Sequence, residues 1–172
     1  TGTTWAGFSA GDIIPSLSGD EIVGLNTTDN KIYILHQSGN NISTVTFINS
    51  PTSNPQWAGV AVGEFDATNP GKEFIIADNS TGQLYLFGYD GTNIAQLASS
   101  SSIGTGITGI TAGNFDGTGD EIAVVNDNTG YIQIYSVSGT TFSLVHQYTY
   151  TGGSYNLWNG ITAGDYDGDG VD

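Results

Sequence analysis

The sequence has no cysteine and only two basic residues among its 172 residues. Without cysteine no disulfide can form, so packing, hydrogen bonds or bound ions must hold the fold together. Lys and Arg number 2 against 17 Asp and Glu, which gives a net charge of −15. A polyanion of this kind repels nucleic acid and anionic membrane surfaces and attracts divalent cations. We therefore expect no nucleic-acid partner.

Long apolar runs are missing as well. No stretch approaches the roughly 18 apolar residues of a membrane span, so membrane insertion is not expected. The sequence has no initiator methionine and no signal-peptide pattern, so we expect any targeting segment to have been removed or never included. Glycine is abundant, with 26 residues, and the apolar residues are largely the strand formers Ile, Val, Leu, Phe and Tyr. This composition favours β-structure.

An internal repeat is the most regular feature of the chain. Four segments share a large apolar residue followed by glycine two and six positions later, and they begin at Trp5, Trp57, Ile107 and Trp158. An acidic, glycine-rich loop follows each segment. The first three loops lead into an apolar run that begins with glutamate. A period of roughly 50 residues indicates a repeat architecture, in which each unit stacks on its neighbours.

Each repeat predicts four short strands separated by turns rich in Asn, Asp and Gly. Four strands in a repeat of this length are typical of a β-propeller blade. We therefore predict an all-β fold of β-propeller type with four-stranded antiparallel blades, at approximately 5–56, 57–106 and 107–157, and a partial blade at 158–172. A β-sandwich is the alternative, and the strict repeat argues against it. Because closed propellers have about 4–8 blades, we expect either a longer chain or an assembly of copies.

The last loop has the most specific chemistry. It reads Asp165-Tyr166-Asp167-Gly168-Asp169-Gly170-Val171-Asp172, with carboxylates at alternate positions that can converge on one hard cation. An EF-hand is a competing interpretation, but it requires flanking helices, whereas a strand-like segment precedes this loop. The loop could also be a polar turn held by its own Asp side chains. Three adjacent carboxylates repel one another without a cation, which makes a plain turn less favourable.

Residues 160–172, Gly-Ile-Thr-Ala-Gly-Asp-Tyr-Asp-Gly-Asp-Gly-Val-Asp, resemble the FG-GAP and VCBS repeats. These repeats form propellers in integrin α chains, in several lectins and in many bacterial surface or polysaccharide-processing proteins. The resemblance implies Ca²⁺ in the loop between the first and second strands of a blade. It implies Asp165, Asp167 and Asp169 as ligands, together with the backbone carbonyl of Val171. The usual ninth, acidic position falls after Asp172, whose own role stays open.

The other three loops depart from the family pattern. The loop from Asn114 to Glu121 keeps plausible ligand oxygens but is one residue short, and we regard it as a weaker second metal site. Its candidate ligands are Asn114, Asp116, Thr118 and Glu121. The loop at 64–73 brings in Lys72, an intrinsic cation, and the loop at 12–21 has lost its middle acids, so we expect no metal at either.

Two further sets of residues could contact ligands. Trp5, Trp57 and Trp158 occupy one repeat position and could stack on a sugar. We favour packing between blades, because the aliphatic Ile107 fills the same position in the third repeat. Three Asn-x-Ser/Thr sequons are candidate glycosylation sites, and their asparagines are Asn26, Asn41 and Asn79.

No nucleophile elbow, phosphate loop or catalytic carboxylate pair is evident. His36 and His146 lie singly on predicted strands, with no acidic motif nearby. We therefore predict a non-enzymatic, calcium-stabilised binding or adhesion module, extracellular or at the cell surface. Its partner would be a protein or glycan ligand, or other copies of itself. A glycan-binding lectin, a self-assembling surface or filament subunit, and an accessory domain of a polysaccharide-degrading enzyme are the alternatives.

Overall fold

The computed structural model describes residues 3–150 and 158–172, and all regular structure in these ranges is β-strand. The first eight strands are β1 (Trp5–Gly11), β2 (Glu21–Asn26), β3 (Lys31–Ser38), β4 (Asn41–Asn49), β5 (Trp57–Gly63), β6 (Glu73–Asp78), β7 (Gln83–Tyr89) and β8 (Ile94–Ser99). The last four are β9 (Ile107–Gly113), β10 (Glu121–Asn126), β11 (Tyr131–Ser138) and β12 (Thr141–Thr149). The described part of the chain contains no helix long and apolar enough to cross a membrane. The all-β prediction is confirmed.

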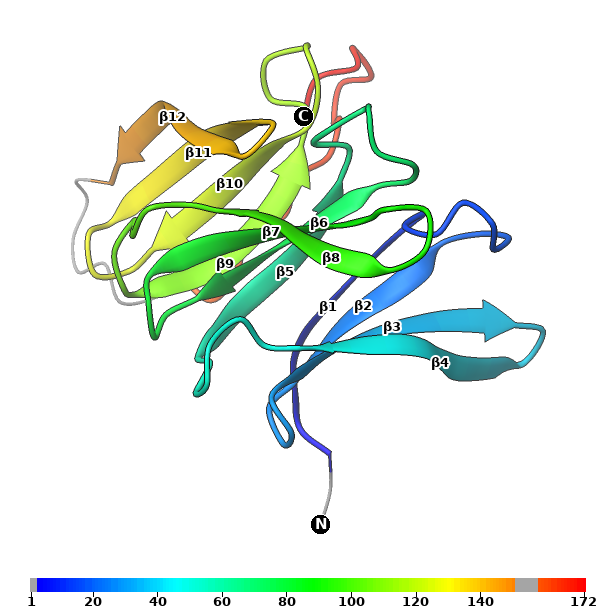
Figure 1. Cartoon of the computed structure of the whole chain (residues 1–172). Helices are drawn as coiled ribbons and strands as arrows, with labels where there is room; N and C mark the ends of the chain where they lie inside the picture. Colours follow the sequence, from blue (N-terminus) through cyan, green and yellow to red (C-terminus); the bar gives the residue numbers. More distant parts are fainter. Residues whose placement is uncertain (1–2, 151–157) are drawn as a thin grey trace.

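Consecutive strands form three separate four-stranded sheets, β1–β4, β5–β8 and β9–β12, in which every neighbouring pair is antiparallel. We refer to these sheets as blades 1, 2 and 3. The sheets fan out from their first strands, so that β5 lies between β1 and β9 (Figure 1). This arrangement confirms the predicted β-propeller-type fold. Residues 151–157, at the end of the predicted third repeat, lie outside the described residues.

Glycines of the repeated segment allow the first strands to approach closely. A Cβ on Gly63 of β5 would lie 3.0 Å from the Cβ of Ala112 in β9. A Cβ on Gly109 of β9 would lie 2.8 Å from the Cα of Gly160. The segment 158–165 therefore lies against β9 much as β9 lies against β5. It was expected to be the first strand of a fourth blade, but it is not a strand, because no second strand lies beside it among the described residues.

The core consists of two layers, one on each side of blade 2. Every residue of β6 is buried, because the sheet is covered on both faces. Side chains alternate across a strand, so Phe74 and Ile76 pack towards blade 1, and Ile75 and Ala77 pack towards blade 3. Phe74 also stacks on Phe87 of β7, with ring centroids 5.2 Å apart. Blade 2 thus connects the two hydrophobic layers.

Candidate metal centre

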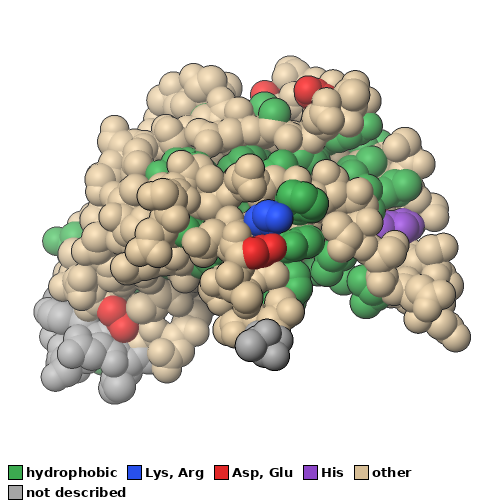
Figure 2. All heavy atoms as spheres, turned by 60° about the horizontal axis from the view of Figure 1, so that its bottom comes forward, with side chains coloured by type: hydrophobic (Ala, Val, Ile, Leu, Met, Phe, Trp, Pro, Cys, Tyr) green, Lys and Arg blue, Asp and Glu red, His purple; other side chains and the backbone are tan. Residues whose placement is uncertain are grey.

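The acidic loops gather at one end of the blades. The connections β1–β2, β5–β6 and β9–β10 lie at the upper ends of their strands in Figure 1, and the terminal loop at 165–172 lies beside the β9–β10 connection. Hydrogen bonds join neighbouring loops directly, since the Lys72 amide donates to the Asp12 carbonyl at 2.7 Å. The opposite end, seen in Figure 2, carries few acidic side chains. Much of the negative charge is therefore concentrated where a cation could bind.

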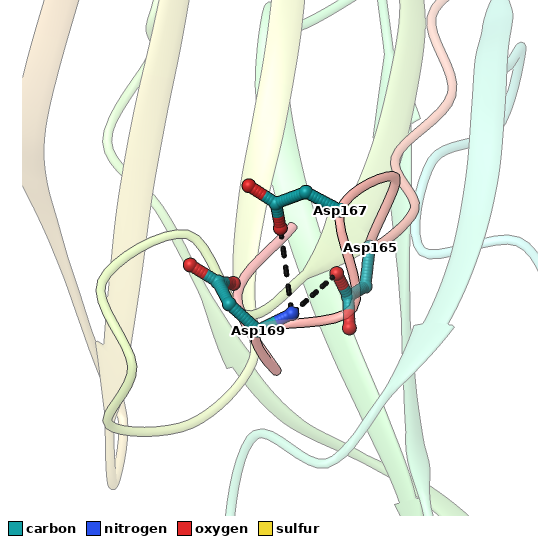
Figure 3. Close-up of side chains that lie close together, drawn as sticks. All are labelled: Asp165, Asp167 and Asp169. Carbon is teal, nitrogen blue, oxygen red and sulfur yellow. Dashed lines mark hydrogen bonds between the residues drawn. The ribbon is translucent and has the colours of Figure 1, made fainter.

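The terminal loop brings three carboxylates together. Asp165, Asp167 and Asp169 are exposed, and each offers an oxygen within 4.8 Å of the others (Figure 3). Calcium–oxygen distances are about 2.4 Å, so two oxygens on one ion lie at most about 4.8 Å apart. The three carboxylates therefore fit a calcium ion. Among the described residues, this is the only group of three acidic or histidine side chains that converges in this way.

Backbone amides of the same loop orient these carboxylates. Asp165 accepts hydrogen bonds at Oδ1 from Gly168 at 2.6 Å and at Oδ2 from Gly170 at 3.0 Å. Asp169 accepts one from the Val171 amide at 2.9 Å. Gly168 and Gly170 have φ values of 81° and 90°, a left-handed conformation that glycine adopts without strain. The amides of Gly170 and then Gly168 hold the pKa of Asp165 below its usual range, so this side chain is ionised at neutral pH.

The weaker predicted site, at Asn114–Glu121, also engages its side-chain oxygens in hydrogen bonds with its own loop. Asn114 Oδ1 accepts a hydrogen bond from Gly117 at 2.7 Å, and Asp116 accepts one from Thr118 at 2.9 Å. Glu121 is buried and accepts a hydrogen bond from Phe115 at 2.8 Å. The side chains of Asn114, Asp116, Thr118 and Glu121 thus stabilise the loop itself. The sequence alone did not indicate this role.

The burial of two glutamates, Glu21 and Glu73, was not predicted from the sequence. Glu21 and Glu73 are fully buried at the start of the second strand of blades 1 and 2. Glu21 accepts a hydrogen bond from the Ile14 amide at 2.8 Å, and Glu73 accepts one from the Phe65 amide at 2.9 Å. Each glutamate therefore anchors the loop that precedes its own strand. The signal was present in the sequence, because a glutamate occupies this position in all three repeats.

His36 does have an acidic partner, contrary to the sequence interpretation. Its Nδ1 lies 3.1 Å from Oε1 of Glu21, because the β2–β3 register places the two residues opposite each other. In blade 2, Gly88 lies next to Glu73 and offers no side chain, and Glu73 Oε1 has no hydrogen-bond partner. Burial accordingly raises the pKa of Glu73.

The tryptophans of the repeat pack against protein. Trp5 lies 5.1 Å from Phe8 between ring centroids, and Trp158 lies 6.0 Å from Tyr150 in an edge-to-face arrangement. Trp57 packs against the core between blades 1 and 2. These contacts favour the packing role over sugar stacking for all three tryptophans.

The three sequon asparagines differ in their surroundings. Asn26 is buried, and its side chain accepts a hydrogen bond from the Thr28 amide at 2.8 Å. Asn79 donates to the Ile107 carbonyl at 2.7 Å and accepts from the Ile107 amide at 2.8 Å, which joins blades 2 and 3. A glycan would disrupt both arrangements, so the structure argues against glycosylation at Asn26 and Asn79. Asn41 is exposed at the start of β4.

No protein-family model matches the chain, and no curated protein matches it. Two solved structures are similar in fold. A periplasmic gluconolactonase from Pseudomonas aeruginosa aligns with 13% identity and a TM-score of 0.54, over 74% of this chain and 36% of that one. A candidate 6-phosphogluconolactonase from Bacteroides uniformis aligns with 14% identity and a TM-score of 0.56, over 84% of this chain and 41% of that one. This chain thus spans less than half the length of either neighbour.

These neighbours contradict the prediction of a non-enzymatic module. Both are identified by name as gluconolactonases, which are hydrolytic enzymes. We therefore withdraw the non-catalytic adhesion, lectin, filament-subunit and accessory-domain interpretations. The prediction was wrong because it took the lack of a nucleophile elbow or a phosphate loop as evidence against catalysis. Hydrolysis of a lactone requires neither, since water is the nucleophile and a bound cation can polarise the carbonyl.

Proposed function

We propose that this chain is part of a lactone-hydrolysing β-propeller that binds calcium in its terminal loop. The convergence of Asp165, Asp167 and Asp169 carries the proposal, because it supplies a cation site at the acidic end of the blades. The fold likeness to two gluconolactonases supports the choice of reaction. The resemblance of residues 160–172 to FG-GAP and VCBS repeats supports the choice of calcium.

The residues of the loop are suited to hold an ion that stays accessible. Three carboxylates and the Val171 carbonyl provide four ligands, whereas calcium takes about 6–8, so positions remain for water and substrate. When bound, the ion would polarise the lactone carbonyl and make bound water more acidic. Water adds to the carbonyl carbon, the ring C–O bond breaks, and a hydroxy acid is released.

A hollow beside the loop provides room for a substrate. It has a volume of about 370 Å³ and is lined by Tyr166, Asp167, Asp169, Val171 and neighbouring residues. The Tyr166 side chain is 88% exposed at this hollow. An exposed aromatic ring can stack on the apolar face of a sugar ring. We therefore assign Tyr166 as the residue that contacts a sugar lactone.

The charge of the protein favours an uncharged lactone over a phosphorylated one. Lys31 and Lys72 are the only basic residues, and Lys31 pairs with Asp29 at 3.8 Å on blade 1. A phosphate group would meet a net charge of −15 without an arginine to bind it. We propose that the protein acts outside the cytoplasm. Calcium sites of modest affinity are occupied there, and one of the two structural neighbours is a periplasmic protein.

The test is hydrolysis of δ-gluconolactone, followed by pH-stat with the spontaneous rate subtracted. We expect hydrolysis that requires calcium, is abolished by EDTA and falls at least tenfold in Asp167→Asn and Asp169→Asn. Asp90→Asn is the matched control, because Asp90 is an exposed turn aspartate that accepts amide hydrogen bonds at 2.7 and 2.8 Å in the β7–β8 turn. A rate that never exceeds the spontaneous one with calcium present would rule out the lactonase proposal.

A further inference from the structure

Asn114 directly follows β9, and its backbone and side chain both form hydrogen bonds with the terminal loop. Its backbone amide donates to Asp172 Oδ2 at 2.7 Å, and its carbonyl accepts from the Asp172 amide at 2.8 Å. Its side-chain Nδ2 donates to the Gly170 carbonyl at 3.2 Å. One residue of blade 3 therefore holds both ends of the segment Gly170–Asp172.

The orientation of the Asn114 amide is set by its own loop. Its Oδ1 accepts the Gly117 amide at 2.7 Å, which leaves the NH₂ group directed at Gly170. An aspartate at this position could keep the bond to Gly117 but would place an oxygen against the Gly170 carbonyl. The contact therefore depends on an amide side chain.

The segment held by Asn114 also orients the carboxylates of the terminal loop. The Gly170 amide donates to Asp165 Oδ2 at 3.0 Å, and the Val171 amide donates to Asp169 Oδ1 at 2.9 Å. Two of the three candidate ligands are thus positioned by residues that Asn114 fixes to blade 3. Ordering a ligand set before the ion arrives reduces the free-energy cost of binding.

We propose that cation binding at Asp165–Asp169 is coupled to docking of residues 158–172 on β9, with Asn114 as the positioning residue. The inference rests on the calcium site proposed above. Docking fixes Gly170 and Val171 and so orients Asp165 and Asp169. Conversely, a bound ion would stabilise the loop conformation in which Gly170 and Asp172 are hydrogen-bonded to Asn114. Coupling between two equilibria is reciprocal, so each stabilises the other by the same factor.

The docking contact extends well beyond the loop. The Trp158 amide donates to Asp127 Oδ1 at 3.3 Å, and Gly109 lies against Gly160 with no room for a Cβ. A methyl group at Gly109 would therefore push the segment away from β9 without touching any candidate ligand. This position offers an independent way to loosen the docking.

The experiment measures calcium affinity by calorimetry and amide hydrogen exchange in the full chain. We expect calcium to slow exchange in residues 158–172 of the wild type. We expect Asn114→Ala and Gly109→Ala to weaken calcium binding about five- to tenfold, within the range of typical couplings. Asn128→Ala is the control, because the Asn128 side chain donates to the Thr105 carbonyl in the connection between β8 and β9 and bonds no residue of the described segment 158–172. Exchange in residues 3–150 shows whether each variant remains folded.

The outcomes separate the two proposals. If the wild type does not bind calcium, the proposed site fails and the coupling fails with it. If the wild type binds but Asn114→Ala and Gly109→Ala bind equally well, the coupling is wrong while the site stands. Weaker binding in both variants, with the control unchanged, supports the coupling.

Discussion

The carboxylate of Asp172 accepts the backbone amide of Asn114 at 2.7 Å. The same relationship recurs one blade earlier, where Asp120 Oδ2 accepts the Glu64 amide at 2.7 Å. In both cases an aspartate near the end of one acidic loop binds the first residue of the preceding loop. The role of Asp172, which the sequence left open, is therefore to join neighbouring loops.

Removing the Asp120 carboxylate is expected to destabilise the joint between blades 2 and 3. Asp120→Ala loses a charge-assisted hydrogen bond that is partly exposed, so we expect a cost of about 1 kcal/mol. In a protein of this size this lowers Tm by about 2–4 °C. Asp20→Ala is the matched control, because Asp20 occupies the same loop position in blade 1 but has no preceding blade among the described residues. Equal Tm values for the two variants in a thermal melt would contradict this role.

The stability of the protein is expected to depend on pH through Glu73. Burial raises the folded-state pKa of Glu73 above its ordinary value of 4.5, so the folded protein binds this proton more tightly than the unfolded chain. The stability contributed by the proton is complete below pH 4.5 and is lost as pH rises through the folded pKa. Glu73→Gln cannot ionise and should lack this loss.

The measurement for Glu73 is the difference in unfolding free energy between wild type and Glu73→Gln, determined by denaturant titration across pH. We expect the difference to move in favour of the variant as pH rises from 4.5, the ordinary value. The amide keeps an acceptor for Phe65 and Asp66, so the loop anchor persists at every pH. Asp20→Asn, which changes an exposed acid, serves as control. A difference that is constant with pH would refute the assignment.

The packing around blade 2 is expected to dominate the stability of the described fold. Phe74 is fully buried and stacked on Phe87, so Phe74→Ala should cost about 3–5 kcal/mol. Phe47 on β4 is 50% exposed, and Phe47→Ala should cost clearly less. Denaturant titration of both variants tests the comparison. A larger loss of unfolding free energy in Phe47→Ala than in Phe74→Ala would contradict the assignment of the main core to blade 2.

The sequence was sufficient to predict the fold. Its repeat, its alternating apolar residues in segments such as 131–135, and its paired glycines predicted the strands and their grouping into blades. These signals are local and periodic, so they can be recognised in the sequence alone. The exception is the segment at 158–165, which matches the repeat but has no second strand beside it in the described chain.

The contacts between strands and blades could not be predicted in the same way. The Glu21–His36 pair depends on the β2–β3 register, and the Asp120–Glu64 bond depends on how blades stack. Neither relationship leaves a spacing that can be recognised along the chain. The non-enzymatic prediction was wrong for another reason, because hydrolysis by water and a bound cation would need no sequence motif beyond the ligands of that cation. Asp165, Asp167 and Asp169 converge, and their role as calcium ligands stays a prediction.

Isothermal calorimetry of the full chain titrated with calcium tests whether Asp165, Asp167 and Asp169 bind the ion. We expect one saturable site with a dissociation constant of about 10⁻⁴ to 10⁻³ M, in the range of extracellular modules. Asp167→Asn should abolish this binding, and Asp90→Asn should leave it intact. The absence of saturable binding by the wild type at millimolar calcium would contradict both the site and the function proposed from it.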